Sequence, residues 1–175
     1  DPLTYRWSQV PNLGTFENPT IANPRYTAGA SPGIGALALE VNDGILSDSA
    51  DATLVVYNPN AGFITGGGWI NSPAGAYAAA PTLTGKATLS FVSKYKKGAS
   101  VPEGAAEIQF PAAQMSFNGT SYQWLVVTGA KAQYKGIGKL NGVSGYGFLL
   151  TATDGQVAGG GGVDKFRIRI WNTST

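Results

Sequence analysis

The stretch DKFRIRIWN, residues 164–172, alternates strictly between apolar and polar side chains. Phe166, Ile168 and Ile170 fall on every second residue, which is the period of a β-strand with one buried face. The opposite face carries the other side chains: Lys165, Arg167, Arg169 and Trp171. We therefore predict a half-buried strand with a basic outer face, on which Trp171 is an exposed aromatic side chain.

Shorter alternating runs fill the rest of the chain, and Gly or Pro interrupts nearly every window long enough for a helix. We predict further strands at residues 3–10, 24–28, 36–41, 52–57, 86–95, 108–117, 122–128, 131–140 and 146–153. Dipeptides typical of tight turns separate several of them: Asp43-Gly44, Lys97-Gly98, Asn118-Gly119, Asn141-Gly142 and Asp154-Gly155. This pattern indicates an all-β fold class, an antiparallel sandwich or barrel, and we expect two β-sandwich-like parts.

The segment Asn58-Pro59-Asn60 is a natural boundary between the parts, so we expect one domain at residues 1–60 and another at 61–175. Their charges differ in sign. Residues 1–60 hold two arginines against six carboxylates, a net charge of −4, whereas residues 61–175 hold ten Lys and Arg against four carboxylates, a net charge of +6. An acidic block can thus meet a basic one, within a chain or between chains.

The chain contains no Cys and no His. Disulfides, Ser–His–Asp and Cys–His catalysis and nearly all zinc chemistry are therefore excluded. No apolar run has the length of a membrane-spanning helix, so we expect no membrane span. Charged residues make up only 13% of the chain, which suits a surface covered by other protein. We predict a protein that is not an enzyme.

Two parts of the sequence resemble known families. The blocks DPLTYRWSQV, NPTIANPRYTA and LALEVNDGILSDSADATLVV, within residues 1–58, resemble the second part of a PKD-like or cadherin-like Ig-fold repeat, with Trp7 as its core tryptophan. The blocks GFITGGGWINSPAGAY, GKATLSFVSKYKKG, YQWLVVTGAKAQYKGIGKLNG, YGFLLTATDGQ and VDKFRIRIW, within residues 61–172, resemble a post-COAP-type secreted bacterial β-domain. These resemblances imply a partial Ig-like domain followed by an antiparallel β-sandwich or jelly-roll-like domain, both extracellular or on the cell surface.

The Ig-like part lacks the strands that its family places before DPLTY, and an incomplete sheet exposes an edge, here near Leu3–Val10, and an apolar face. We expect a strand of another subunit, or the second domain, to cover them, and we favour the neighbouring chain. The expected donors are residues 164–172 or 1–10. The protein is then a homo-oligomer or polymer held through β-edges, and a structural building block of a cell-surface or filamentous assembly. The alternative is an accessory module of a larger secreted protein that binds carbohydrate or another surface partner.

Two glycine runs and one pair of glutamates are candidate functional sites. Gly66-Gly67-Gly68 and Gly159–Gly162 precede no helix, so we assign them to turns or bulges rather than to phosphate binding. Glu103 and Glu107 lie beside Pro102 and Gly104, and we expect them in a solvated loop rather than in a catalytic pair. We thus expect no catalytic or cofactor-binding residues.

Calcium is the one metal left open, since aspartates supply the oxygen ligands that it prefers. The acidic residues concerned are Asp1, Asp43, Asp48, Asp51, Asp154 and Asp164; solvated turns are the preferred interpretation, and no metal site is assigned. A basic and aromatic set is typical of nucleic-acid binding, but it belongs to no known module and we expect no nucleic-acid partner. Its members are Lys94, Lys96, Lys97, Lys131, Lys135, Lys139, Tyr95 and Tyr134.

Tryptophans can form a sugar-binding platform, and Trp69, Trp124 and Trp171 are the candidates, although we expect Trp124 in the core. The alternation predicts a set of largely buried side chains. They are Tyr5, Trp7, Leu39, Val41, Leu54, Val56, Phe91, Trp124, Val126, Phe148, Leu150, Phe166, Ile168 and Ile170.

Overall fold

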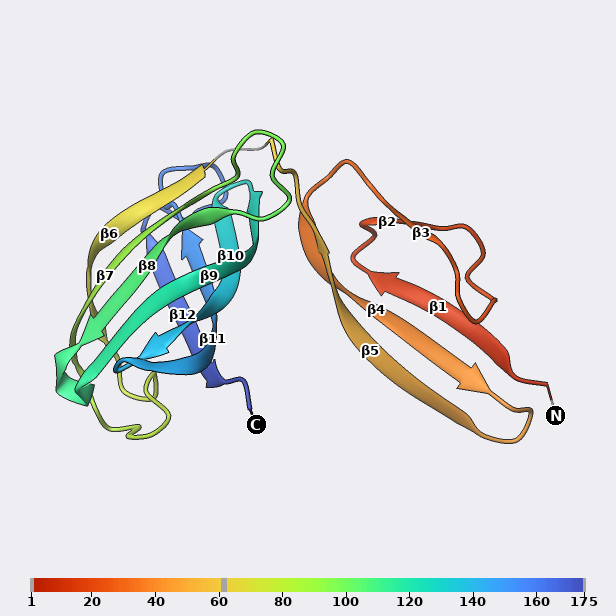
Figure 1. Cartoon of the computed structure of the whole chain (residues 1–175), viewed down its shortest axis with the longest axis horizontal. Helices are drawn as coiled ribbons and strands as arrows, with labels where there is room; N and C mark the ends of the chain where they lie inside the picture. The colour runs from red at the N-terminus through yellow and green to blue at the C-terminus, as the bar shows by residue number, and fades with distance from the viewer. Residues whose placement is uncertain (1, 61–62, 175) are drawn as a thin grey trace. The chain divides into compact units, whose positions relative to one another are not determined.

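The computed structural model describes residues 2–60 and 63–174 and is all-β, as predicted (Figure 1). The described residues form twelve strands and one short 3₁₀ helix, η1 (Pro111–Ala113), and no helix among them is long and apolar enough to cross a membrane. The chain divides into two compact units, Asp1–Asn58 and Pro59–Thr175. We call them the N-terminal and C-terminal units.

The N-terminal unit contains a three-stranded antiparallel sheet and a small hairpin. The sheet has the order β1-β4-β5, and the hairpin pairs β2 with β3. Their bounds are β1 (Thr4–Val10), β2 (Gly14–Phe16), β3 (Tyr26–Ala28), β4 (Gly33–Asn42) and β5 (Ser47–Val56). The predicted turn at Asp43-Gly44 joins β4 to β5, whereas β2 was not predicted.

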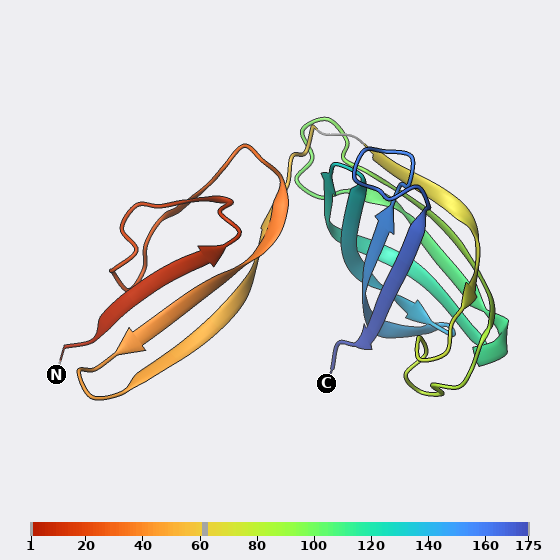
Figure 2. The same cartoon turned by 180° about the vertical axis from the view of Figure 1, so that it is seen from behind.

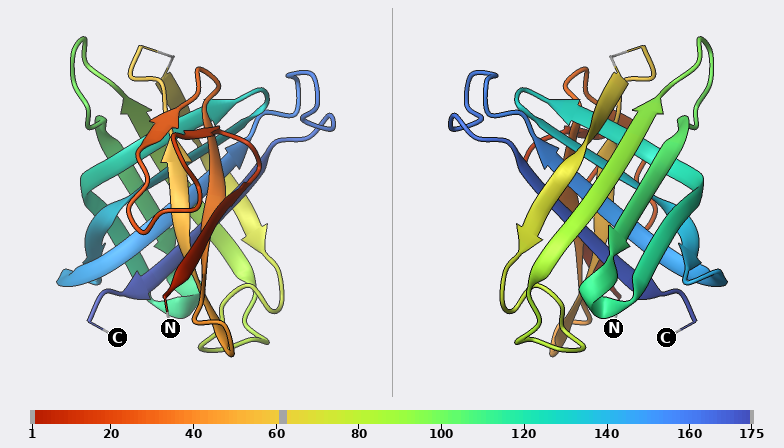
Figure 3. Two further views of the ribbon diagram at one scale, coloured as in Figure 1. Left: turned by 90° about the vertical axis from the view of Figure 1, so that its right-hand side faces the viewer. Right: turned by 90° about the vertical axis from the view of Figure 1, so that its left-hand side faces the viewer.

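The C-terminal unit is one seven-stranded antiparallel sheet in which every strand pairs with its neighbours in sequence, without the crossing connections of a jelly roll. Figure 3 shows β6–β9 crossing over β11 and β12, so the curled sheet packs in two facing layers. The rings of Phe91 and Phe166, from β7 and β12, stack across these layers with centroids 6.0 Å apart. The bounds are β6 (Phe63–Ser72), β7 (Gly85–Lys94), β8 (Glu103–Phe110), β9 (Met115–Thr128), β10 (Lys131–Leu140), β11 (Val143–Thr153) and β12 (Lys165–Asn172).

Three local predictions in this unit were wrong. A continuous strand over residues 108–117 is interrupted by η1, because Pro111 has no N–H to give to the sheet. Asn118-Gly119 is not a turn but lies inside β9, where the register with β10 shifts. Glu103 and Glu107 lie in β8 rather than in a loop, since β7 and β9 pair with that segment on either side.

The core of the C-terminal unit is an aromatic cluster between the two layers. Phe117, Tyr134 and Phe148 are completely buried, and the Phe148 ring lies 5.4 Å from Phe117 and 5.3 Å from Tyr134. Gly136 leaves room for this cluster, because a Cβ there would lie 2.7 Å from the Phe148 ring. The same cluster includes ten buried residues: Ile64, Phe91, Ala106, Ile108, Phe117, Leu125, Ala132, Tyr134, Phe148 and Leu150.

The predicted core is confirmed in part. Val56, Phe91, Val126, Phe148 and Leu150 are buried, and Phe166, Ile168 and Ile170 are half-buried against the core. Six other predicted residues are only half-buried: Tyr5, Trp7, Leu39, Val41, Leu54 and Trp124.

The prediction that Trp124 lies in the core was wrong. Leu125 pairs with the buried Tyr134, so Trp124, opposite Lys135, points to the outer face of the sheet. A register shift next to Lys135 and Gly136 leaves Gln123 without an opposite residue, and one extra residue exchanges the two faces of a strand.

Tyr134 makes the C-terminal unit less stable at alkaline pH. Its hydroxyl donates a 2.7 Å hydrogen bond to the Ala105 carbonyl, and burial, together with the neighbouring Tyr122, raises its pKa well above 10. In the unfolded chain Tyr134 ionises near pH 10, whereas in the folded chain it stays neutral. The contribution of Tyr134 to the free energy of unfolding is therefore intact below about pH 10, and it falls above that pH by up to ~1.4 kcal/mol per pH unit.

We expect Tyr134→Phe to unfold more easily at pH 7, by about 1–2 kcal/mol, but to lose less stability between pH 10 and 11 than the wild type. Urea denaturation at a series of pH values measures both effects. Identical alkaline slopes in the two proteins would contradict this assignment.

Candidate interaction surfaces

The two faces of the N-terminal sheet differ in polarity. The register pairs Trp7 with Leu39 and Leu39 with Ala50, so these three side chains lie on one face. We call it the apolar face; it is formed by Tyr5, Trp7, Leu37, Leu39, Val41, Ala50, Ala52 and Leu54. Two polar residues share it, Gln9 opposite Leu37 and Asp48 opposite Val41. The opposite, polar face carries Arg6, Ser8, Glu40, Ser49 and Asp51.

The segment that contains β2 and β3 covers the β1 side of the apolar face (Figures 1 and 2). The Phe16 ring lies 6.0 Å from that of Trp7 and 5.0 Å from that of Tyr26, measured between centroids. The Tyr26 hydroxyl donates a 2.7 Å hydrogen bond to Gln9 Oε1, which also accepts from the Leu13 N–H. Aromatic packing and these hydrogen bonds hold the segment over β1.

The β5 side of the apolar face has no such cover. A hollow of about 480 Å³ opens there, with an apolar floor and a polar rim. The apolar lining residues are Leu3, Leu39, Val41, Leu46 and Ala50, and the polar ones are Asp43, Ser47, Asp48 and Ser49. Leu46 is 71% exposed and Leu3 is 52% exposed. Among described residues 2–58, Leu13 and Val56 are the only apolar side chains that are buried. The unit therefore has half of a hydrophobic core and no second layer over β5.

The two edges of this sheet also differ. On the β1 edge, the Trp7 N–H donates to the Pro19 carbonyl at 2.9 Å, and Trp7 Nε1 donates to the Ile21 carbonyl at 3.2 Å. The chain thus occupies the middle of its own β1 edge, at Trp7. No described strand pairs with the outer edge of β5, which is ten residues long and contains neither Pro nor Lys. Its charged residues are Asp48 and Asp51, and the unpaired main-chain groups of such an edge are a template for a strand of another chain, preferably one of opposite charge.

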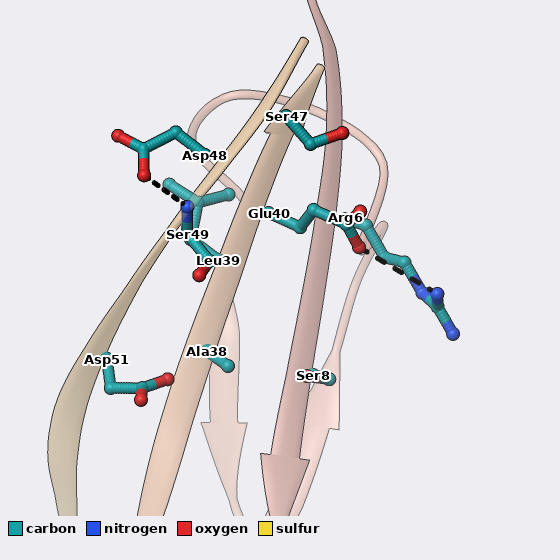
Figure 4. Close-up of a pocket in the computed structure, with 9 residues that line it drawn as sticks. All are labelled: Arg6, Ser8, Ala38, Leu39, Glu40, Ser47, Asp48, Ser49 and Asp51. Carbon is teal, nitrogen blue, oxygen red and sulfur yellow. Dashed lines mark hydrogen bonds and ion pairs between the residues drawn. The ribbon is translucent and has the colours of Figure 1, made fainter.

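The polar face carries a shallow groove of about 510 Å³ (Figure 4). In it Arg6 Nη1 lies 3.9 Å from Glu40 Oε2, at the limit of an ion pair, and Asp51 on β5 lines the same groove. With two carboxylates and one guanidinium, this face is acidic next to β5.

The candidate calcium ligands do not gather at one site. Within the described residues no group of three acidic side chains is close enough to hold a metal ion, and Asp1 lies outside them. Asp43 Oδ1 instead accepts hydrogen bonds from the N–H groups of Ile45 and Leu46, which lower its pKa. Asp48 accepts from the Ser49 N–H in β5, so it too serves local backbone.

Asp154 and Asp164 serve the long loop between β11 and β12 in the same way. Asp164 Oδ1 accepts from the Gly155 N–H at 2.8 Å, and Asp154 Oδ1 accepts from the Gln156 N–H at 2.9 Å. Gly159–Gly162 lie in this loop, as predicted, and β12 rather than a helix follows them. For Gly66-Gly67-Gly68 the prediction of a turn or bulge was wrong: they lie within β6 and pair with β7 in unbroken register, and Gly66 gives space to the Phe91 ring.

Glu103 and Glu107 do not form a glycosidase-like pair. They lie four residues apart in β8, which corresponds to about 13 Å along an extended strand, whereas glycosidases hold their carboxyl groups ~5 to ~9.5 Å apart. Glu103 instead forms a 2.6 Å ion pair with Lys96. This pair closes the connection between β7 and β8.

The basic and aromatic set is likewise dispersed. Tyr134 is buried, and the Tyr95 hydroxyl is hydrogen-bonded to the backbone of Leu125. Neither ring is thus available as a stacking platform. Lys94, Lys96 and Lys97 lie at the end of β7 and in the turn that follows, whereas the others lie on β10, three strands away: Lys131, Lys135 and Lys139.

The tryptophans occupy different strands. Trp69, on β6, is 59% exposed, and the Lys86 ammonium lies 5.0 Å from its ring centroid. Trp171, on β12, is 37% exposed, packs over Gly147 and has the Lys135 ammonium 5.9 Å from its ring centroid. Trp171 is therefore an exposed aromatic side chain, as predicted.

The strands at the two edges of the C-terminal sheet are β6, which pairs with β7, and β12, which pairs with β11; no described strand pairs with the outer edge of either. A groove of about 620 Å³ separates them, lined by Phe63 and Trp69 on one side and Phe166 on the other. The outward side chains of β12 include Lys165, Arg167 and Arg169, all exposed, and the strand contains no acidic residue. The β12 edge is thus basic, in contrast to the acidic β5 edge.

Comparison with protein-family models, with curated proteins and with solved structures gives no match to this chain. The interpretation of these surfaces therefore rests on their own residues and geometry.

Proposed function

We propose that this protein is a non-enzymatic structural subunit of an extracellular or cell-surface assembly, in which copies of the chain associate through their β-strand edges. The observation that carries the proposal is the uncovered apolar face beside β5, with its exposed Leu3 and Leu46. Apolar surface gains about 25 cal/mol for each Å² removed from water, and the main-chain groups of an unpaired edge strand are a template for another strand.

The extracellular location rests on the resemblance of residues 61–172 to a secreted β-domain. The small share of charged residues, 13%, supports a surface that contacts other copies. The uncovered part of the apolar face and the unpaired edge are both at β5, so one added strand or layer covers both.

Sedimentation velocity over a range of concentrations tests this function. We expect the 18.1 kDa chain to form particles of many copies as its concentration rises, and electron microscopy to show rings or filaments. A single species of one chain's mass at every concentration would overturn the proposal.

Carbohydrate binding is the second candidate, and the exposed Trp69 favours it. An exposed indole presents a flat apolar surface of the kind that stacks on a sugar ring. Titration with soluble polysaccharides tests it, with Trp69→Ala as the variant and Trp124→Ala, which is half-buried on another strand, as the control. Equal binding by the wild type and Trp69→Ala would dismiss this candidate.

A further inference from the structure

We propose that β5 of one copy pairs with β12 of the next copy, so that the N-terminal sheet of one subunit continues into the C-terminal sheet of its neighbour. This inference rests on the proposed function and names the two edges that meet. Because the two edges differ, the contact is heterologous and repeats head to tail, which gives a ring or a filament.

The charges of the four edges single out this pair. The β5 strand carries Asp48 and Asp51 and no basic residue, whereas β12 carries three basic residues and no acidic one. Like charges opposite each other on neighbouring strands are destabilising, so neither strand pairs well with a copy of itself. The β6 edge has no charged residue, and the chain's own Pro19 carbonyl occupies the β1 edge beside Trp7.

The faces of the two strands match as well. On β5, Ala50, Ala52 and Leu54 lie on the apolar face, with Asp48 at the end of the same row, and on β12, Phe166, Ile168 and Ile170 face the core. Because side chains alternate between the faces of paired strands, a register that aligns these two apolar rows also aligns the two outer rows. The outer rows are Ser49, Asp51 and Thr53 on β5 and Lys165, Arg167 and Arg169 on β12.

In that register Asp51 lies beside the arginines of β12, and Glu40, on the adjacent strand β4, adds a second carboxylate to the same face. The two units as a whole are also complementary in charge, with a net charge of −4 on the N-terminal unit and +6 on the C-terminal unit. This attraction also speeds the encounter of two copies at low salt. The eight-residue β12 and the ten-residue β5 have similar lengths, so β5 can satisfy the outer edge of β12 along its length.

Charge reversal and restoration test the pairing in the full chain. We expect Arg167→Asp/Arg169→Asp to raise the concentration needed for assembly at least about tenfold, and Ser49→Arg/Asp51→Arg to do the same. A chain that carries all four substitutions regains assembly, because the charges are exchanged. Circular dichroism checks that every variant keeps its strands.

Lys94→Asp/Lys97→Asp is the matched control: it changes the net charge by the same amount as the β12 variant, at exposed positions on and after β7. We expect it to assemble like the wild type. Three outcomes with a wild type that assembles would overturn the pairing while the proposed function stands. The β12 variant could assemble as well as the wild type, the control could lose as much assembly as the β12 variant, or the four substitutions together could fail to restore assembly. A wild type that never assembles overturns the proposed function itself.

Discussion

Replacing Phe148 with alanine is expected to lower the free energy of unfolding of the C-terminal unit by about 3–5 kcal/mol. Phe148 is completely buried, and its ring packs against the rings of Phe117, Tyr122 and Tyr134. Its removal leaves a cavity between the two layers of the curled sheet, where the surrounding rings cannot all move in to fill it. A domain of this size has only ~5–15 kcal/mol to lose.

Phe63→Ala is the matched control for this variant. Phe63 is 65% exposed at the start of β6, so the same truncation is expected to cost less than about 0.5 kcal/mol. Urea denaturation followed by tryptophan fluorescence measures both. Similar losses in the two variants would show that the core does not lie between the layers.

The second large effect concerns assembly rather than folding. Ala50→Asp/Ala52→Asp places two charges on the apolar face of β5, at positions that are exposed in the single chain. We expect the stability of the single chain to change by less than about 1 kcal/mol, because both side chains stay in water. Assembly buries these positions against another copy, and an unpaired charge is costly to bury, so we expect assembly to weaken at least about a hundredfold.

Ser49→Asp/Thr53→Asp supplies the opposite case on the same strand. These residues are exposed on the polar face, so the variant adds the same two charges to the other side of β5. We expect it to assemble at least as well as the wild type, and better at low salt, because the added carboxylates face the basic row of β12. Equal loss of assembly by both double variants would contradict the assignment of the faces.

The sequence was most informative where alternation was strict. The pattern of β12, with Phe166, Ile168 and Ile170 inward, and the turn at Asn141-Gly142 were both predicted and are confirmed. Alternation reports directly on the burial of one face, and Asn-Gly reports on a local backbone conformation. Neither depends on what lies far away in the chain.

The misses depend on partners distant in sequence. The glycines of β6 are weak strand formers, and only the ring of Phe91, on the next strand, explains why Gly66 belongs there. Trp124 was placed on the wrong face because the irregular residue Gln123 becomes visible only when β9 is paired with β10.

For the candidate surfaces, the sequence predicted an incomplete N-terminal sheet and an acidic block opposite a basic one. It placed the open edge near Leu3–Val10, whereas the chain's own Pro19 carbonyl accepts a hydrogen bond from Trp7 N–H on that edge and no described strand pairs with the outer edge of β5. No sequence pattern links Trp7 to Pro19, so this contact could not be predicted.

Amide hydrogen exchange of the wild-type chain, measured below and above the concentration at which it assembles, tests the central claim most directly. Backbone N–H groups of an edge strand exchange quickly when they face water and slowly once another strand pairs with them. If the N-terminal sheet is completed by another copy, exchange in β5 (Ser47–Val56) and β12 (Lys165–Asn172) slows together by at least about tenfold on assembly, while β1 changes little. Unchanged exchange in β5 on assembly would contradict the claim.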